Sequence, residues 1–479
     1  MIRRTKIVAT VGPASSEDAV LTALMESGVS VFRLNFSHGT LEDKAEVIRR
    51  IRAISKQRQN AVAILGDLQG PKIRVGQFEN GQIALTPGEE VTITSLDIAG
   101  RKGLIPTVYK NLPRDVRPGD QILLDDGLME LEVLTSDGTD VRCRVRFGGL
   151  LKDRKGINLP GVAVSAPSLT EKDLEDLRFC IEQEVDYLAL SFVRRAADVL
   201  ELKSLLKQSQ SQIRVISKIE KPEAVDNFAE ILAASDGIMV ARGDLGVEIR
   251  PEKVPLIQKD IICKCNQAGK PVITATQMLE SMINNPRPTR AEASDVANAI
   301  LDGTDAIMLS AETATGNYPV EAVSLMDRVA LDVETVASLR GKDISPGANG
   351  DGFDLSEAIG QAACQLSLRV GAKAILAFTQ TGNTATLVAK YRPPVPIYAV
   401  TPSRSVRRRL ALYSGVRSLR VDIEGSTEGQ IEQVDKAVLA AGVLKAGDVV
   451  VITMGSPISE PGTTNLLKVH QLGAGQEAS

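Results

Sequence analysis

Eight short apolar runs alternate with helical segments through most of the sequence, and this alternation limits the fold more than any other feature. The runs are apolar throughout rather than alternately polar and apolar, which is typical of parallel strands covered on both faces. Eight strand and helix units predict an α/β protein with a closed (β/α)8 TIM barrel, and an open doubly wound sheet is the alternative. The predicted strands are residues 6–11, 29–36, 61–65, 185–192, 213–217, 237–240, 271–276 and 306–309.

The segment between the third and fourth predicted strands, residues 71–167, has a different pattern. Its short apolar runs are separated by turn signals such as Pro87-Gly88 and Asp137-Gly138. We expect an inserted small β-barrel domain, which should cover the barrel as a lid because it leaves at the carboxyl end of a strand. The barrel then comprises residues 1–70 and 168–340. The runs are residues 82–85, 91–95, 121–124, 128–134 and 141–147.

A polar, glycine-containing stretch, residues 341–352, is the predicted linker to a third domain. Residues 353–479 again alternate between apolar runs and helical segments, which predicts a small, mostly parallel C-terminal α/β domain. The hydroxyl-rich loop 379–384 runs into a predicted helix and suits a phosphate, because backbone N–H groups are free at helix N-termini. Ordinary N-capping by Thr384 or a neighbour is the alternative, which the loop alone favours.

Composition excludes several classes of function. The chain has 56 Lys and Arg against 60 Asp and Glu, so it lacks the basic excess that nucleic-acid binding usually leaves. No apolar run approaches the roughly 20 residues that span a bilayer, and the start resembles no secretory signal, so we expect a cytoplasmic protein without a membrane partner. The five cysteines form no disulfide or zinc spacing, and only His38 and His470 are available to a histidine-based site.

Charged residues stand where two neighbouring predicted strands end. Lys218 and Glu220 follow the fifth strand, and Asp244 follows the sixth. In parallel barrels this rim is where ligands bind. Glu220 and Asp244 are hard oxygen donors that suit a shared Mg²⁺, and Lys218 suits a phosphoryl group, whereas an ordinary ion pair is the alternative for any one residue. The other polar residues expected at this rim are Arg33, Asn35, Ser37, Asp67, Thr276, Ser310 and Glu312.

Long motifs in the chain resemble the pyruvate kinase family, and the resemblance runs from TKIVATVGPAS near the start to GTTNLLKVH near the end. It implies a barrel with an inserted lid and a C-terminal regulatory domain. It also implies transfer of the phosphoryl group of phosphoenolpyruvate to ADP, which gives ATP and pyruvate in glycolysis. The most specific motifs are FRLNFSHG (32–39), GDLQGPKIR (66–74), SKIEKPE (217–223), MVARGDLGVE (239–248) and MLSAET (308–313).

The resemblance assigns roles to the residues in these motifs. It implies that Glu220 and Asp244 hold the essential Mg²⁺ and that Lys218 stabilises the transferring group and the enolate. Arg33 and Arg74 should bind phosphates. The backbone at Gly243 and Asp244 should bind the substrate carboxylate. Thr276 should lie beside the enolate methylene and, with Ser310 and Glu312, belong to the network that delivers the proton. The residues implied to bind the nucleotide are Asn35, His38, Arg74, Asp126 and Lys155.

One departure from the family concerns its monovalent cation. Many members require K⁺, held by positions that match Asn35, Ser37, Asp67 and the Leu68 carbonyl, and carry an acidic residue where this chain has Lys72. An ammonium group can supply the same single charge. We therefore expect activity to need Mg²⁺ but not K⁺.

The resemblance also reverses the preference for simple capping in the loop 379–384. Thr379, Thr381, Gly382, Asn383 and Thr384 match the family's effector phosphate loop. The later loop, residues 455–464, has no Arg, Lys or Trp with which to bind a second phosphate. We therefore predict activation by a monophosphate, such as a sugar phosphate or AMP, rather than by fructose 1,6-bisphosphate. A homotetramer is expected from the family alone.

Two rival functions remain open at this point. One is another Mg²⁺-dependent barrel enzyme, a lyase or mutase acting on phosphoenolpyruvate or a 2-oxo acid, which needs neither ADP nor a lid. The other is a catalytically silent protein that senses sugar phosphates through its third domain. The complete set of Lys218, Glu220, Asp244 and Arg33 speaks against silence.

Overall fold

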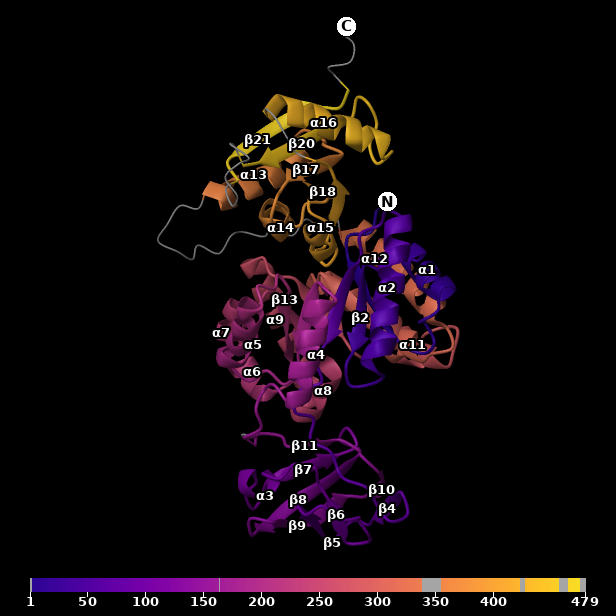
Figure 1. Ribbon diagram of the computed structural model, residues 1–479, viewed down its shortest axis with the longest axis vertical. Coiled ribbons are helices and arrows are strands. Elements are labelled where there is room, and N and C mark those ends of the chain that lie inside the picture. Colours follow the sequence, from indigo (N-terminus) through magenta and orange to yellow (C-terminus); the bar gives the residue numbers. More distant parts are fainter. Residues whose placement is uncertain (1, 163, 338–354, 423–426, 456–463, 474–479) are drawn as a thin grey trace.

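The computed structural model describes residues 2–162, 164–337, 355–422, 427–455 and 464–473. A central barrel lies between an inserted sheet at one end and a C-terminal α/β domain at the other (Figure 1). No helix in these ranges is long and apolar enough to cross a membrane. The predicted linker, residues 341–352, lies outside the described residues, and the predicted domain boundaries stay a prediction.

The barrel is closed by eight parallel strands in the order β1-β16-β15-β14-β13-β12-β3-β2, with β2 returning to β1. This confirms the predicted (β/α)8 fold over the open sheet. The first strand pairs with the last, Lys6 against Ala306, so no edge remains in this sheet. The strands are β1 (Lys6–Val11), β2 (Val31–Asn35), β3 (Ala63–Asp67), β12 (Tyr187–Leu190), β13 (Arg214–Ile219), β14 (Gly237–Ala241), β15 (Val272–Ala275) and β16 (Ala306–Leu309).

Helices cover the outside of the barrel, and their apolar faces pack on the strands in one continuous core. Three of these helices begin with a capping box, at Thr40, Thr170 and Thr289. Each such cap typically contributes about 1 kcal/mol. The helices are α1 (Asp18–Glu26), α2 (Leu41–Gln57), α4 (Glu171–Glu182), α5 (Ala196–Gln208), α6 (Pro222–Asp226), α7 (Phe228–Ala234), α8 (Arg242–Glu248), α9 (Val254–Ala268), α10 (Arg290–Asp302), α11 (Ala311–Ala314) and α12 (Pro319–Ala337), with single 3-10 turns at Pro251–Lys253 and Glu280–Ile283.

The helical segment after β13 is divided, where the sequence pattern suggests one helix. Asn227 leaves the helical conformation between α6 and α7, with ψ at 18°. Its side-chain amide donates to the Arg194 carbonyl at 2.9 Å, a contact with a distant loop that competes with a continuous helix.

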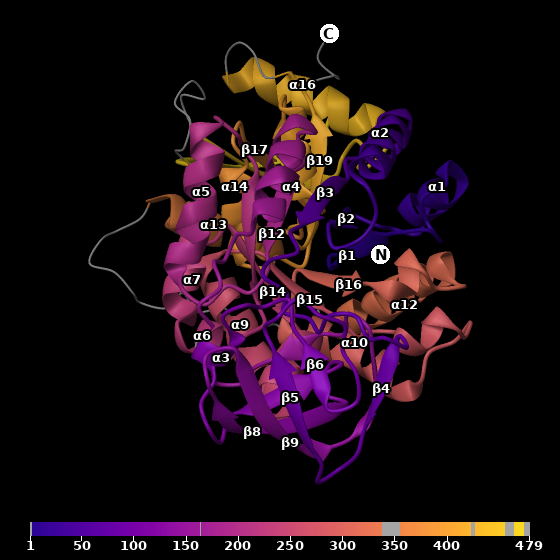
Figure 2. The ribbon, with the colours of Figure 1, turned by 60° about the horizontal axis from the view of Figure 1, so that its bottom comes forward.

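The inserted domain is a curled six-stranded sheet in the order β11-β7-β8-β9-β5-β6, accompanied by the two-stranded pair β10-β4. Figure 2, turned to bring this domain forward, shows the curl of β5, β8 and β9. Strands β6 and β11 escaped the sequence pattern because three and two residues are too short to show alternation, and β10, with the sequence GLLK, does not alternate. The elements are β4 (Gln82–Leu85), β5 (Glu90–Thr94), β6 (Leu104–Pro106), α3 (Leu112–Asp115), β7 (Gln121–Leu124), β8 (Met129–Ser136), β9 (Asp140–Phe147), β10 (Gly149–Lys152) and β11 (Ile157–Asn158).

The C-terminal domain is a five-stranded sheet in the order β19-β18-β17-β20-β21, parallel except for β21. The predicted small α/β domain is thus confirmed. Its elements are α13 (Leu355–Arg369), β17 (Ala374–Phe378), α14 (Asn383–Lys390), β18 (Ile397–Thr401), α15 (Arg404–Leu410), β19 (Val416–Arg420), α16 (Thr427–Ala440), β20 (Val449–Met454) and β21 (Leu466–Gln471).

Ion pairs join the C-terminal domain to the amino end of the barrel. Asp186, just before β12, accepts from Arg408 of α15 at 2.7 Å and from Arg52 of α2 at 2.8 Å. Asp305, just before β16, pairs with Arg392 at 2.9 Å. The opposite end of the barrel is therefore left to the inserted domain.

Candidate active site at the carboxyl rim of the barrel

Lys218, near the end of β13, is the cationic centre of the rim, and its side chain is only 12 % exposed. Its Nζ lies 2.7 Å from Glu220 Oε1 and 3.4 Å from Asp67 Oδ1. Burial by itself would lower the pKa of Lys218, but the nearby carboxylates outweigh burial and hold the pKa above its ordinary value. The amine is therefore a permanent positive charge at this rim.

Arg33 and Asp67 form a second buried pair beside Lys218. Both Nε and Nη2 of Arg33 lie 2.7 Å from Asp67 Oδ2, and Nη1 donates to the Thr10 hydroxyl at 3.0 Å. Burial favours the protonated form of Asp67, yet Lys218 and Arg33 together hold its pKa below the ordinary value. Two contacts with one oxygen of Asp67 and a third with Thr10 hold the Arg33 guanidinium in one orientation.

Glu220 and Asp244 are the two acidic side chains expected to hold a metal ion. Burial raises the pKa of Glu220, Lys218 opposes this shift, and repulsion by Asp244 adds to it. That repulsion shows that the two carboxylates lie within electrostatic reach of each other. Asp244, on α8, makes no hydrogen bond or ion pair with another described residue. One carboxylate of the pair is therefore open to a ligand.

The number of protein ligands fits a magnesium ion that is shared with substrate. Within the described ranges, no group of three or more His, Cys, Asp or Glu residues could enclose a metal. Mg²⁺ typically uses one or two carboxylates and completes its octahedron with waters and substrate oxygens. Glu220 and Asp244 match that requirement.

Ser191 and Phe192, which follow β12, were missed by sequence reasoning. The Ser191 hydroxyl accepts from Lys218 Nζ at 2.8 Å and donates to the Leu68 carbonyl at 2.7 Å. The Phe192 N–H donates to Glu220 Oε2 at 2.9 Å, from a backbone with φ of 55°. A non-glycine residue at positive φ often marks a functional site, but this signal is visible only in the structure.

Thr276 follows β15 and also has a positive φ, 69°. Its hydroxyl accepts from the Gly243 N–H at 2.7 Å and donates to the Ala275 carbonyl at 2.6 Å. The Gly243 N–H was expected to face a substrate carboxylate, but here it is engaged by Thr276. Glycine permits this close approach, because a Cβ at this position would lie 3.3 Å from the Thr276 hydroxyl.

Glu312 and Ser310 form a buried loop contact at the end of β16. Glu312 accepts from the Ser310 N–H at 2.7 Å and from the Leu279 N–H at 3.1 Å, and burial raises its pKa. Both oxygens thus hold backbone in place. Participation of these residues in proton delivery stays a prediction.

Comparison with known proteins now identifies the family. The family description "Pyruvate kinase, barrel domain" matches residues 2–323, and "Pyruvate kinase, alpha/beta domain" matches residues 357–470. The chain belongs to the pyruvate kinase family. It is 49 % identical over 477 residues to pyruvate kinase of Sporosarcina psychrophila and 47 % identical over 474 residues to that of Staphylococcus aureus, in each case over 98 % of this chain and 81 % of the relative. A crystal structure of a pyruvate kinase from Cryptosporidium parvum superposes with a TM-score of 0.92 at 39 % identity, covering 98 % of this chain and 96 % of that one.

Family membership makes the protein a phosphotransferase, which confirms the expected enzyme class. Membership in the pyruvate kinase family implies phosphoenolpyruvate, ADP, ATP and pyruvate as substrates, and dependence on a divalent metal. At the carboxyl rim of this fold, the buried cations Lys218 and Arg33 lie near the Asp244 carboxylate, which is open to a ligand.

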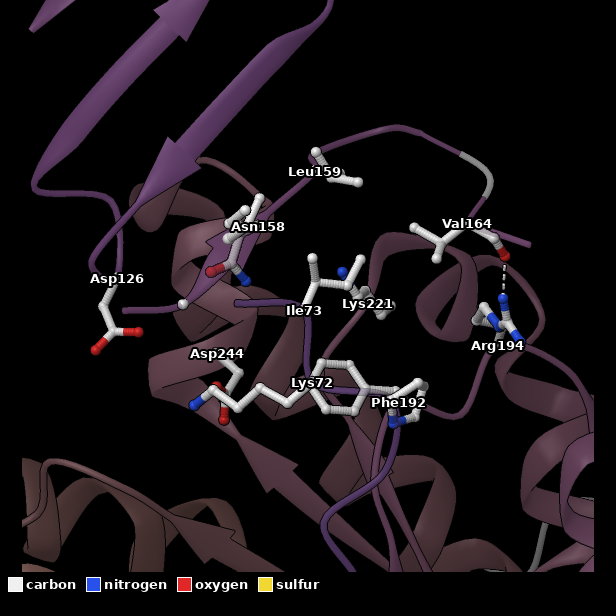
Figure 3. A pocket seen from close by; sticks show the side chains of 13 residues that line it. Lys72, Ile73, Asp126, Asn158, Leu159, Val164, Phe192, Arg194, Lys221 and Asp244 are labelled. Atoms are coloured by element: carbon white, nitrogen blue, oxygen red, sulfur yellow. Dashed lines mark hydrogen bonds between the residues drawn. The ribbon is translucent and has the colours of Figure 1, made fainter. Parts of the chain in front are cut away.

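The predicted nucleotide residues surround the opening between barrel and lid. Asp126, Lys72 and Asp244 line one small cavity, and in the view of Figure 3 the tip of Lys72 lies beside Asp244. Lys155, which precedes Gly156 of the cavity lining, pairs with Asp125 at 2.8 Å. Arg74 is half-buried and donates to the Arg154 carbonyl at 3.0 Å. The structure thus brings Asp126 to the rim and leaves the Lys155 amine paired within the lid.

His38 is exposed beside this opening. Partial burial lowers its pKa, and the positive charges of Arg74 and Lys72 lower it further. An imidazole in such surroundings is neutral at pH 7, because protonation would add a third positive charge. The excess of cations suits an anionic ligand.

The positions expected to hold a monovalent cation already have partners. Asn35 Oδ1 accepts from the Ser37 N–H at 3.0 Å, and the Leu68 carbonyl accepts from Ser191. Asp67 is paired with two cations, as described above. Lys72 forms no ion pair with Asp67 or with any other residue that the structure describes. The cations on Asp67 are Arg33 and Lys218, and the replacement of the monovalent ion by Lys72 stays a prediction.

The predicted effector loop forms a compact turn before α14. Thr379 Oγ1 accepts from the Gly382 N–H at 2.8 Å, and Gly382 has a φ of 103°. The alternative was N-capping by Thr384 or a neighbour, and its first half, capping by Thr384, is wrong. The helix begins at Asn383 with Gly382 as a cap that has no side-chain hydrogen bond, while the Thr384 hydroxyl contacts Thr464 at 3.0 Å. The Thr381 hydroxyl accepts weakly from the Asn383 N–H at 3.5 Å.

Proposed function

We propose that the chain transfers the phosphoryl group of phosphoenolpyruvate to ADP with Mg²⁺ as its divalent metal. The single observation that carries this proposal is the buried Lys218 amine, held between Asp67 and Glu220, with the open Asp244 carboxylate in reach. Phosphoryl transfer requires mainly positioning and neutralisation of charge on the equatorial oxygens. A fixed cation beside two metal-binding carboxylates supplies both requirements.

Each residue then has a definite task. Glu220 and Asp244 would hold Mg²⁺, which would neutralise charge on the phosphoryl oxygens of the substrate. Lys218 presents its ammonium to the transferring group and to the oxygen that becomes the enolate. Arg33, oriented by Asp67, binds the phosphate from the side of β2.

The nucleotide approaches from the lid side of the rim. Arg74 and Lys72 lie close enough to His38 to lower its pKa, and Asp126 and Lys72 line the same cavity. Thr276, fixed by Gly243 and the Ala275 carbonyl, is proposed to lie beside the enolate methylene. Lid closure over this opening would exclude water from the reacting groups.

ATP formation separates this function from its rivals. Purified protein is incubated with phosphoenolpyruvate, ADP and Mg²⁺, and ATP is measured by luciferase, with EDTA as the negative control. A lyase or mutase consumes phosphoenolpyruvate without ATP, and a silent sensor leaves it unchanged. Absence of ADP-dependent ATP formation in metal-replete protein would overturn the proposal.

We further propose that activity is independent of K⁺. The supporting observation is that Asp67, which matches a monovalent-cation position of the family, is neutralised by Arg33 and Lys218. Lys72 adds another positive charge near the rim, where many members of the family have an acidic residue.

Assays in Tris-buffered MgCl₂, with and without 100 mM KCl, test this independence. We expect less than a twofold difference for the wild type and a many-fold activation by K⁺ for Lys72→Glu, because that variant restores an uncompensated acid. Lys102→Glu, in an exposed turn of the lid, is the matched control. A many-fold K⁺ activation of the wild type would contradict the proposal.

We also propose that a monophosphate binds the loop of Thr379, Thr381, Gly382, Asn383 and Thr384 and activates the enzyme. The loop opens on a cleft of about 340 Å³. The barrel contributes Lys203, Arg214 and Lys270 to this cleft, and α15 contributes Arg409. Residues 456–463 of the later loop, on which the choice of a monophosphate depends, lie outside the described residues.

Titration of effectors against the phosphoenolpyruvate saturation curve decides between candidate activators. Glucose 6-phosphate, ribose 5-phosphate, AMP and fructose 1,6-bisphosphate are compared at equal concentration. A monophosphate should shift the curve to lower substrate concentration, and Thr381→Val should abolish the shift. Activation by the bisphosphate alone would contradict the proposal. Light scattering on the same samples tests the proposed homotetramer.

A further inference from the structure

Glu248, the last residue of α8, is a buried carboxylate that the proposed reaction does not use. Its side chain is 1 % exposed. Oε1 accepts from Lys221 Nζ at 2.5 Å and from Asn158 Nδ2 at 2.8 Å. Oε2 is buried without a hydrogen-bond partner among the described residues. A buried, half-satisfied carboxylate costs stability, so its presence needs a reason.

Glu248 and its two partners, Lys221 and Asn158, come from three different segments around the carboxyl rim. Glu248 lies four residues after Asp244, so both side chains lie on the same face of α8. Lys221 directly follows Glu220. Asn158 belongs to β11 of the lid, two residues after the bridge that Gly156 forms with Arg74. Figure 3 shows Asn158, Lys221 and Asp244 around the same cavity.

Lys221 is tied to Glu220 by a second route. Its ammonium lies 5.7 Å from the centre of the Phe192 ring. The backbone N–H of the same Phe192 donates to Glu220 Oε2. A cation over an aromatic ring is attracted to it, and the attraction grows when water is excluded. The Lys221 and Glu248 pair therefore joins the helix that carries Asp244 to the segment that fixes Glu220.

We propose that Glu248 is a positioning residue that sets the spacing of Glu220 and Asp244 and links that spacing to the position of the lid. The proposal rests on the proposed role of these two carboxylates in holding the divalent metal. The lid enters through Asn158, since its amide shares Oε1 of Glu248 with Lys221. A movement of β11 changes the geometry of the Glu248 carboxylate and, through α8 and Lys221, the geometry of both metal-holding side chains.

A purely structural role is the competing explanation, and the two differ in what they predict for metal affinity. Partners that orient metal ligands typically change metal affinity 10- to 100-fold when they are removed. An anchor that only holds α8 in the fold would change thermal stability and leave the affinity of the folded protein unchanged.

The test measures Mn²⁺ binding directly, by electron paramagnetic resonance titration of substrate-free protein. We expect Glu248→Gln and Lys221→Met each to weaken Mn²⁺ binding about tenfold, and the double variant to be no weaker than either single one. Asn158→Ala should weaken Mn²⁺ binding in the same direction by a smaller factor and raise the KM for ADP more than it lowers kcat. Glu252→Gln, an exposed change in the turn after α8, is the control and should bind as the wild type does.

Two results decide the matter. Unchanged Mn²⁺ affinity in folded Glu248→Gln, whatever its melting temperature, would overturn the proposal. If the wild type formed no ATP, the proposed reaction would fail, but the ratio of Mn²⁺ affinities between wild type and variant would still decide the role of Glu248.

Discussion

The two ends of the barrel bury charged side chains in opposite ways. At the amino end, Asp186 is fully engaged: one oxygen accepts from Arg408, and the other accepts from Arg52 and from the Ile64 N–H at 2.9 Å. At the carboxyl rim, Asp244 has no partner among the described residues and repels the buried Glu220. The same residue type completes the fold at one end and leaves room for a ligand at the other.

This difference has an energetic basis. Glu220 is buried and Asp244, partly buried, repels it, so the rim is less favourable than it would be with a cation bound between the two carboxylates. The amino end carries no such cost, because its carboxylates are matched by guanidinium and backbone donors. We therefore expect changes at the amino end to alter stability and changes at the rim to alter activity and metal response.

The largest effect is expected at the rim. Lys218→Met should lower kcat at least 10³-fold, about 4 kcal/mol of transition-state stabilisation, because the charge beside the transferring group is lost. Steady-state ATP formation measures the loss, and circular dichroism confirms that the variant is folded. Lys207→Met, which removes an exposed lysine near the end of α5, should retain activity within twofold. Comparable losses of kcat in both variants would contradict the claim that charged residues at the rim, and not those at the amino end, determine activity.

The next effect belongs to the amino end. Asp186→Ala leaves Arg52 and Arg408 without their shared carboxylate, and should lower the free energy of unfolding by about 3 kcal/mol while kcat and KM at 25 °C stay within twofold. Urea denaturation and initial rates measure the two quantities. Asp260→Ala breaks an exposed pair with Lys264 and should cost less than about 0.5 kcal/mol. A folded Asp186→Ala protein with wild-type stability would contradict the account.

Mg²⁺ should stabilise the protein through its binding at the carboxyl rim. Mg²⁺ at 100 times its dissociation constant should raise the free energy of unfolding by about 2.7 kcal/mol, and EDTA should reverse the gain. Differential scanning calorimetry with and without MgCl₂ measures it. Asp244→Asn should remove most of this gain, because the open carboxylate is lost. Equal Mg²⁺ stabilisation in that variant would place the metal elsewhere.

The smallest effect is a pH dependence at the amino end. Burial lowers the pKa of Lys6 to about 7, and Arg3 and Arg417 add to the shift. Between pH 7 and pH 10 the unfolded chain binds this proton and the folded chain does not, so the wild type should gain stability relative to Lys6→Met by about 1 kcal/mol per pH unit. Urea denaturation at pH 7.5, 8.5 and 9.5 tests this. A constant or falling difference would show that Lys6 stays protonated in the fold.

The barrel could be predicted from sequence because its strands are covered on both faces and therefore read as uninterrupted apolar runs. The same register brings the strand ends together, so Lys218, Glu220 and Asp244 could be placed at one rim from their positions alone. The proximity of Glu220 and Asp244 is thus a consequence of topology, which local sequence determines well here.

Contacts between distant segments could not be predicted in this way. Ser191 and Phe192 hold Lys218 and Glu220 from another strand, and nothing in their local sequence shows it. The break at Asn227 follows from a loop contact with the Arg194 carbonyl. Glu248 reads as an ordinary helical residue until Asn158 of the lid is placed against it.

A crystal structure with Mn²⁺, located by its anomalous scattering, tests the central claim most directly. The account predicts an anomalous peak at the carboxyl rim, coordinated by one oxygen each of Glu220 and Asp244, with the Lys218 amine beside the open coordination positions. An Mn²⁺ peak bound elsewhere, with Asp244 turned away from Glu220, would contradict it.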